Sequence, residues 1–323
     1  MRLTTRITTP FLLLFLALSA CGEPAELDNQ SNQDEQPNQQ HDDDNDNSND
    51  NQANDDNYDL PDVRDHMGPI GEDGREVEPI FPDDYDVEGD HPLLFLLHGY
   101  GSDAQETIDG FDAGEEANEY NAIRLAPEGH REDSQGMLFW NAIETCCDFE
   151  ESGVDDVAYL TNLIDEAIHN YAVDPDRIYF LGISNGAMMS HRMACERGDL
   201  INSIVSFNGT STRDAIDCLP EDPVNIYHVH GTDDDTVAYD GNTAFAGARE
   251  VVDRWARWND CDDEPIEGPS VNVTGAVAGD ETDIERWEGC TDGGDVELWT
   301  MNGAGHVPLP LADFPQLLFE TIM

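Results

Sequence analysis

The sequence contains no lysine. All 14 of its basic residues are arginine, and they stand against 71 aspartate and glutamate residues, which gives a net charge of −57. A nucleic acid needs a basic patch to bind, so this composition excludes it as a partner. The acidic excess extends along the chain, with 15 acids in residues 22–66 and 56 beyond them. Such a surface suits high salt, which screens repulsion between carboxylates. We therefore expect a halophilic protein that is stabilised by added salt.

Cysteine pairs with metal-binding spacing are also missing. The chain has seven cysteines but no pair of C-x-x-C motifs, and the adjacent Cys146 and Cys147 do not fit a zinc-finger spacing. We therefore expect neither a metal nor a cofactor.

Six cysteines remain once Cys21 is set aside, an even number that predicts disulfides in an exported domain. We expect Cys261 to pair with Cys290, because the two bracket one insertion late in the chain. We also expect either Cys146 or Cys147 to reach Cys195 or Cys218.

Residues 1–21 have the pattern of a secretory signal. Arg2 and Arg6 precede an apolar run over residues 11–18 that is too short to span a membrane. The following Leu18-Ser19-Ala20-Cys21 resembles a bacterial lipobox, in which Cys21 is lipidated; ordinary cleavage without a lipid is the alternative. Gly22 comes next, and in such signals this implies sorting to the outer membrane. We expect a protein anchored by lipid at the periplasmic face or the cell surface, or released outside the cell.

Residues 22–66 consist largely of Asp, Asn, Gln and Ser. Such a segment buries too little apolar surface to offset its ordering entropy, so we expect a disordered acidic tether. The catalytic domain is then expected over residues 67–323.

The most informative stretch of that domain is residues 177–195. An apolar run over 178–183 predicts a buried strand, Gly182 to Gly186 form a G-x-S-x-G motif, and residues 187–196 favour a helix. A strand, a sharp turn and a helix are the context of a nucleophile elbow. This order predicts Ser184 as the nucleophile.

Strands and helices alternate through the rest of the domain. We expect further strands over residues 75–81, 93–97, 122–126, 201–207, 224–229 and 296–301, and helices over 155–171, 243–258 and from Pro315. Asp155 and Asp156 would cap the first of these helices, and Asp174-Pro175 would break the chain before the strand of the elbow. The alternation indicates an α/β fold, with a mostly parallel sheet covered by helices on both faces.

Partners for Ser184 follow later strands. His306 lies in a glycine-rich loop after the last strand, where it can act as the base, and Asp233, Asp234 and Asp235 are consecutive candidates for the acid.

The oxyanion hole is expected earlier in the chain. The backbone N–H of Tyr100, after the turn that begins with His98, and the N–H of Asn185 would form it. Trp140 is a candidate wall of the substrate site, with a place in the core as the alternative.

Five segments carry a resemblance to a known family: residues 92–102, 140–160, 174–196, 228–241 and 303–308. Together they resemble the bacterial esterases described as polyhydroxybutyrate depolymerases and feruloyl esterases, which have the α/β-hydrolase fold. The resemblance implies a secreted, metal-independent serine hydrolase that cleaves carboxylic esters. It also implies that Asp234 is the catalytic acid, with Asp235 a minor candidate because acids flank it here.

Two other classes use the same features. A serine peptidase has the same triad, and a non-catalytic lipoprotein can reuse the scaffold to bind a surface ligand. For the esterase, the expected partner is a polyester or an esterified polysaccharide fragment, and the only expected membrane contact is the lipid anchor.

Overall fold

The computed structural model describes residues 67–323, apart from 112–113, 309 and 312–313. The predicted signal with its lipidation site Cys21, and the predicted tether over residues 22–66, lie outside the described residues.

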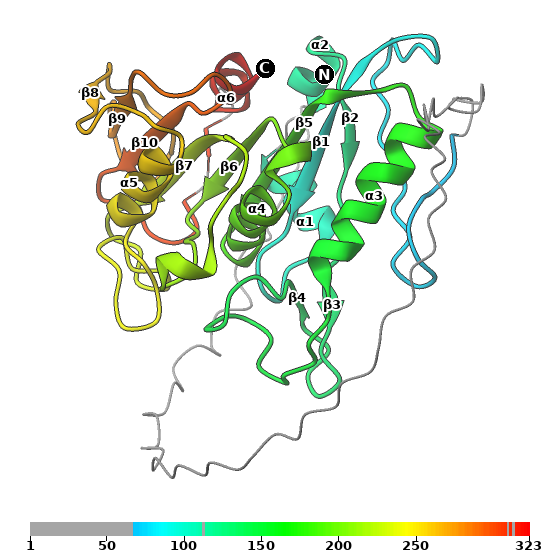
Figure 1. Ribbon diagram of the computed structural model, residues 1–323, viewed down its shortest axis with the longest axis horizontal. Helices are drawn as coiled ribbons and strands as arrows, with labels where there is room; N and C mark the ends of the chain where they lie inside the picture. Colours follow the sequence, from blue (N-terminus) through cyan, green and yellow to red (C-terminus); the bar gives the residue numbers. More distant parts are fainter. Residues whose placement is uncertain (1–66, 112–113, 309, 312–313) are drawn as a thin grey trace, which may run out of the picture. The chain divides into compact units, whose positions relative to one another are not determined.

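The framework is an eight-stranded sheet with the order β2-β1-β5-β6-β7-β10-β9-β8 (Figure 1). Neighbouring strands are parallel from β2 to β10, and β9 is antiparallel to both β10 and β8. A separate hairpin joins β3 and β4. The strands span β1 His91–Leu97, β2 Ile123–Leu125, β3 His130–Arg131, β4 Leu138–Phe139, β5 Val173–Ile183, β6 Ser203–Phe207, β7 Asn225–Gly231, β8 Ile266–Glu267, β9 Thr282–Trp287 and β10 Val296–Met301.

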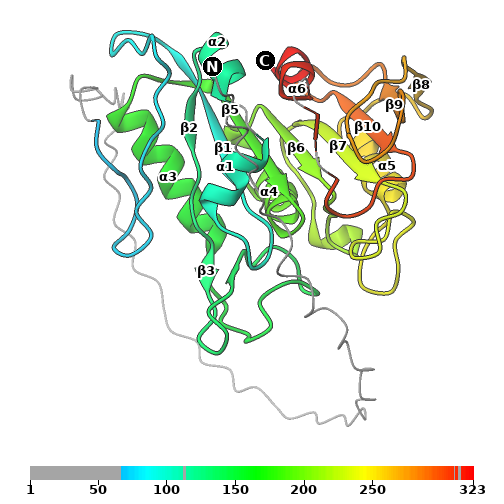
Figure 2. The same cartoon turned by 180° about the vertical axis from the view of Figure 1, so that it is seen from behind.

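Helices cover both faces of the sheet, as Figures 1 and 2 show from opposite sides. The set α3, α4 and α5 packs on one face, and the set α1, α2 and α6 packs on the other. The helices span α1 Ala104–Phe111, α2 Gly114–Glu119, α3 Asp156–Asn170, α4 Asn185–Glu196, α5 Ala248–Trp258 and α6 Phe314–Ile322.

Strand β1 shows why both faces need cover. All seven of its residues are buried. Leu93 and Phe95 belong to the core beneath α3, α4 and α5, while Leu94 and Leu96 belong to the core beneath α1, α2 and α6. A continuous apolar run is typical of a parallel strand buried on both faces. The predicted α/β-hydrolase architecture, a mostly parallel sheet between helices, is confirmed.

Two predictions about strands are wrong. Residues 75–81 form no strand, because only Val77 and Ile80 make ladder-like bridges, to Ile70 and Arg124. Asp174-Pro175 does not break the chain, since both residues lie inside β5. The ladder between β1 and β5 shifts register between His91 and Leu93, which accommodates this start.

Two predictions about helices also need correction. Helix α5 begins at Ala248 rather than at residue 243. Of the predicted capping pair, Asp155 does cap α3, because its side chain accepts from the Ala158 N–H. Asp156 instead is fully buried, where it accepts hydrogen bonds from Arg75 Nη2 and from the Asn141 N–H, each at 2.8 Å. Asp156 therefore ties down the loop before α3.

Three disulfides join the six cysteines of the described part. Cys261 pairs with Cys290, as predicted. The expectation for the others is wrong, because Cys195 pairs with Cys218 and Cys146 pairs with its neighbour Cys147.

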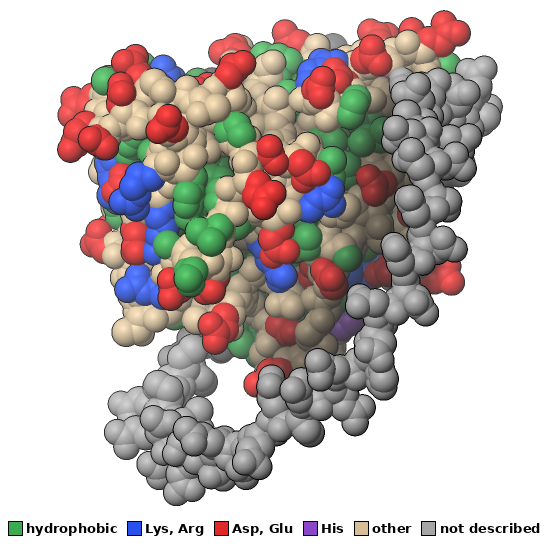
Figure 3. Space-filling model, in the orientation of Figure 1, with side chains coloured by type: hydrophobic (Ala, Val, Ile, Leu, Met, Phe, Trp, Pro, Cys, Tyr) green, Lys and Arg blue, Asp and Glu red, His purple; other side chains and the backbone are tan. Residues whose placement is uncertain are grey.

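Acidic side chains are spread over the face shown in Figure 3, with arginines among them. Among the described residues, no helix combines the length and the apolar character needed to cross a bilayer.

Candidate active site

Ser184 stands on the sharp turn between β5 and α4. Its φ of 53° and ψ of −117° lie in a region that L-residues rarely adopt. The turn needs glycine on both sides: a Cβ on Gly182 would lie 2.3 Å from the Gly186 carbonyl oxygen, and one on Gly186 would lie 2.2 Å from the Leu97 carbonyl oxygen. The G-x-S-x-G motif therefore forms the predicted turn between a strand and a helix, and it places the Ser184 hydroxyl at the N-terminus of α4.

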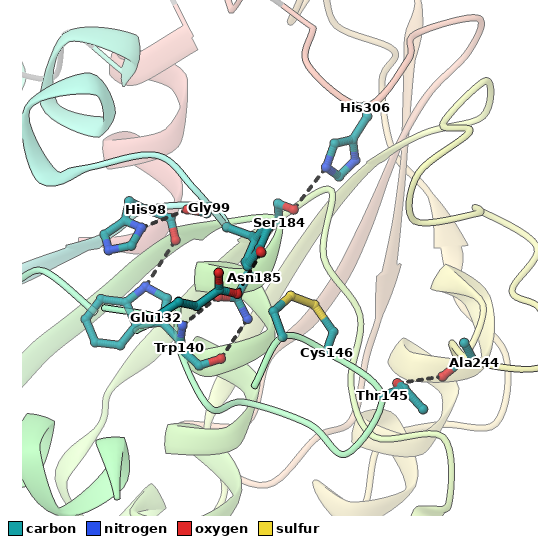
Figure 4. Close-up of a disulfide and its surroundings, with 12 residues drawn as sticks. His98, Gly99, Glu132, Trp140, Thr145, Cys146, Ser184, Asn185, Ala244 and His306 are labelled. Atoms are coloured by element: carbon teal, nitrogen blue, oxygen red, sulfur yellow. Dashed lines mark hydrogen bonds between the residues drawn. A yellow bond between two sulfur atoms is a disulfide. The ribbon is translucent and has the colours of Figure 1, made fainter. Parts of the chain in front are cut away.

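The structure brings the three predicted triad residues together. His306 Nε2 lies 2.9 Å from Ser184 Oγ, and His306 Nδ1 lies 2.7 Å from Asp234 Oδ2 (Figure 4 shows the first contact). His306 is 7% exposed and Asp234 is 6% exposed, so water barely reaches the ion pair that forms when His306 takes a proton. This arrangement can activate a serine hydroxyl as a nucleophile.

Among the three consecutive aspartates, burial selects one. Asp234 is buried against His306, whereas Asp233 and Asp235 are exposed. Asp234 Oδ1 also accepts from the backbone N–H groups of Thr236 and Val237. Burial by itself raises the pKa of Asp234, but hydrogen bonds from His230 and His306 outweigh it and hold that pKa well below its usual range.

The predicted oxyanion donors also face the correct end of the sheet. Tyr100 follows the end of β1, Asn185 opens α4, and β1 and β5 are parallel neighbours. Among the described residues, neither backbone N–H has a hydrogen-bond partner in the chain. Two unpaired donors beside Ser184 can stabilise negative charge on a carbonyl oxygen under attack.

The family model described as phospholipase/carboxylesterase matches residues 87–261, more than half of the chain. The chain belongs to this family. It is a carboxylic ester hydrolase with the α/β-hydrolase fold, as the sequence predicted.

Two curated relatives are feruloyl esterases. Feruloyl esterase B of Piromyces equi is 29% identical over 246 residues, which cover 72% of this chain and 42% of that one. The match thus spans less than half of the Piromyces protein. Feruloyl esterase D of Neurospora crassa is 26% identical over 227 residues, covering 70% of this chain and 72% of that one.

A solved structure, the acetyl xylan esterase from Aspergillus awamori, superposes with a TM-score of 0.56 at 12% identity. The alignment covers 79% of this chain and 98% of that one. At this identity the likeness supports the fold.

The loop that carries the predicted oxyanion donor Tyr100 is held by buried polar contacts. His98 Nδ1–H donates to the Gly99 carbonyl at 2.8 Å, and His98 Nε2 accepts from the Gly129 N–H at 2.9 Å. Burial lowers the pKa of His98 to about 4, so the ring is neutral and keeps this tautomer. The Tyr100 hydroxyl donates to Glu132 Oε1 at 2.7 Å. The N–H of Tyr100 is therefore placed by contacts on both sides of it.

Trp140 supports this loop from the core and is not a wall of the substrate site, which corrects the prediction. Its side chain is fully buried, and Nε1–H donates to the His98 carbonyl at 3.1 Å. Its backbone is held by the side chain of Asn185, which accepts from the Trp140 N–H at 2.7 Å and donates to the Trp140 carbonyl at 2.9 Å. Asn185 thus links α4, through Trp140, to the loop that begins at His98.

Sequence reasoning missed Asn208, which follows β6. Its Nδ2 donates to the His306 carbonyl at 2.7 Å, and its Oδ1 accepts from the Gly231 N–H at 2.9 Å. Asn208 is fully buried and has a φ of 49°. An Asn-Gly pair directly after a buried strand is the signal that could have found it, because that pair favours a positive φ.

The Cys146–Cys147 disulfide is a second missed feature. Figure 4 draws it in one close-up with Ser184 and Asn185. On the same loop, the Thr145 hydroxyl donates to the Ala244 carbonyl at 3.0 Å, which connects this loop to the segment after the acid turn.

Proposed function

We propose that this carboxylesterase is an exported serine esterase that removes acyl groups from esterified plant cell-wall polysaccharide. The observation that carries the proposal is the Ser184–His306–Asp234 arrangement next to two unpaired backbone donors. The substrate class is supported by the relatives, whose names specify feruloyl and acetylxylan esters.

The first half of the reaction forms an acyl-enzyme. Ser184 Oγ attacks the ester carbonyl carbon while His306 Nε2 takes the hydroxyl proton, and Asp234 stabilises the imidazolium through Nδ1–H. The carbonyl oxygen becomes an oxyanion that accepts from the N–H groups of Tyr100 and Asn185. The intermediate collapses, the bond to the alcohol oxygen breaks, and His306 returns the proton to that oxygen.

The second half releases the acid. A water molecule gives its proton to His306 Nε2 and attacks the acyl carbon, and the same two N–H groups hold the second oxyanion. When this intermediate collapses, Ser184 leaves and regains its proton from His306. Each step uses groups of this chain and one water molecule.

The test compares esters on the purified full chain, with Ser184→Ala as the blank. The substrates are methyl ferulate, acetylated xylan and a hydroxybutyrate oligomer, assayed in molar salt. We expect the ferulate or the acetyl ester to be hydrolysed fastest and Ser184→Ala to lose at least about 10³-fold in kcat. Preference for the hydroxybutyrate oligomer would replace the proposed substrate with a polyester. Retention of activity in Ser184→Ala would overturn the mechanism.

Export is supported by the signal-like residues 1–21 and by the disulfides of the folded part. We further propose that Cys21 carries the lipid and that residues 22–66 hold the enzyme away from the outer membrane. Labelling with a fatty-acid analogue in a bacterial host should mark the wild type and not Cys21→Ser. A labelled Cys21→Ser, or an unlabelled wild type, would contradict the anchor.

A further inference from the structure

Three buried histidines form a continuous row behind the triad. His191 lies on α4, and His228 and His230 lie on β7, with exposed fractions of 1%, 0% and 1%. His191 Nε2 is 3.3 Å from His228 Nδ1, and His228 Nε2 is 3.2 Å from His230 Nδ1. The mechanism above uses none of these rings, although the row ends at the triad acid.

The two ends of the row fix where its protons lie. At one end, Trp255 Nε1–H can only donate, and it lies 3.1 Å from His191 Nδ1. At the other end, the Val237 carbonyl can only accept, and it lies 2.8 Å from His230 Nε2. His191 Nδ1 is therefore an acceptor, and His230 Nε2 carries a hydrogen.

The hydrogens of His191 and His228 can be assigned in the same way. Burial lowers the pKa of His191 to about 3 and that of His228 well below 6.5, so both rings are neutral at pH 7 and each carries one hydrogen. His191 donates from Nε2, so His228 accepts at Nδ1 and donates from Nε2 to His230. Every ring nitrogen in the row is satisfied, and all N–H groups point from Trp255 toward the acid turn.

That direction has a consequence for Asp234. His230 Nε2 lies 3.3 Å from Asp234 Oδ2, the same oxygen that accepts from His306 Nδ1 at 2.7 Å. An opposite tautomer of His230 would place a lone pair against the carboxylate and repel it. The row therefore keeps an N–H directed at the oxygen that orients the catalytic base.

We propose that His191, His228 and His230 are positioning residues of the active site, which hold the Asp234 carboxylate in place for His306 by donating in one direction. The row also connects two parts of the machinery, because His191 lies on the helix that begins beside Ser184 and His230 lies on the strand that precedes Asp234. This inference deepens the proposed function and rests on the catalytic role of the triad.

The first experiment reads the tautomers directly. In the wild-type protein labelled with ¹⁵N-histidine, nitrogen NMR at pH 7 should show His191 and His228 neutral, and a hydrogen on Nε2 of all three rings. A hydrogen on Nδ1 of any of the three overturns the proposal. This measurement needs no substrate, so it stays decisive even if the proposed esterase activity fails.

The second experiment separates positioning from stability. His228 touches neither Ser184 nor His306, so we expect His228→Leu to lower kcat about tenfold and to leave KM within about twofold. His228→Gln can still accept and donate, and it should restore most of kcat.

The matched control is His91→Leu. His91 is 1% exposed, and at the start of β1 its Nδ1 donates to the Asn121 carbonyl while its Nε2 accepts from the Asp86 N–H. Its removal should reduce stability and leave kcat of the folded enzyme unchanged. Equal loss of kcat in His91→Leu and His228→Leu, or unchanged kcat in His228→Leu, would overturn the positioning role. If His228→Leu does not fold, His228→Gln against His228→Asn, whose shorter side chain cannot reach both neighbours, gives the same comparison.

Discussion

On one side of Ser184, the acid and the base follow two adjacent parallel strands, β7 and β10, and are fixed by neighbouring buried side chains. On the other side, the predicted oxyanion loop packs against residues 126–155, where the described regular structure is a hairpin of two residues per strand. The strand side derives its geometry from the sheet itself. The loop side derives its geometry from single contacts made by His98, Trp140 and Asn185, so it should be the easier side to change.

The largest expected effect lies on the strand side. Asp234→Asn should lower kcat about 10⁴-fold, because an amide favours the wrong tautomer of His306. Asp235→Asn is the matched control, since its exposed side chain should leave kcat within about twofold. Steady-state kinetics of the two purified variants check the difference. Similar losses in both would remove the distinction that burial draws between these neighbours.

The disulfides provide the next contrast. Cys195–Cys218 closes a sequence separation of 23 residues, so Cys195→Ala with Cys218→Ala should lower the free energy of unfolding by about 3 kcal/mol and spare kcat. Cys146–Cys147 joins adjacent residues and closes no such loop. Replacing both with serine should barely change stability, yet lower kcat/KM about tenfold, because the loop that carries the pair is tied by Thr145 to the segment after the acid turn.

Urea unfolding and ester hydrolysis measured on both double variants check this contrast. Loss of stability without Cys146–Cys147, together with loss of activity without Cys195–Cys218, would contradict the roles expected for the two disulfides.

On the loop side, Asn185→Ala keeps its backbone N–H but loses both hydrogen bonds to the backbone of Trp140. We expect kcat to fall about tenfold to a hundredfold, because the oxyanion loop is no longer tied to α4. Trp140→Phe, which loses only the hydrogen bond to the His98 carbonyl, should have a smaller effect. A larger loss in Trp140→Phe than in Asn185→Ala would show that the tryptophan is the main support.

The smallest expected effect is a loss of stability at mildly acidic pH, and it comes from buried histidines on both sides of Ser184. Burial lowers the pKa of His98 to about 4 and that of His191 to about 3. On acidification, the unfolded chain binds these protons at a higher pH than the folded chain does. The folded state therefore keeps this contribution to its stability above pH 6.5 and loses it as the pH falls toward those values. Between pH 7 and 5.5, each histidine should cost about 1 kcal/mol.

Urea unfolding at constant molar salt measures this loss. A free energy of unfolding that stays level or rises between pH 7 and 5.5 would contradict it.

The sequence could locate the turns that carry Ser184 and His306 because each is encoded locally. Ser184 lies in a five-residue motif between a strand and a helix, and His306 follows the last strand. Asp234 could not be chosen by position alone, since its neighbours are also acids, and the resemblance to known esterases selected it before burial did.

What the sequence could not show depends on contacts between distant segments. The side chain of Asn185 meets Trp140 across 45 positions. The histidine row forms only when α4, α5 and β7 pack together, and no local sequence pattern predicts that packing. The segment over residues 75–81 looked like a strand because a local pattern does not reveal whether a neighbouring strand has room to pair.

The two outer strands of the sheet bear on the behaviour of so acidic a protein in brine. Molar salt shortens the range of repulsion to a few ångströms, about 3 Å at 1 M, so charge no longer keeps the molecules apart. β2 spans three residues and is already bridged by Ile80, and β8 spans two. Neither edge offers a long row of free backbone groups to a second molecule. Short, partly covered edges therefore oppose aggregation under the conditions in which the carboxylates have ceased to do so.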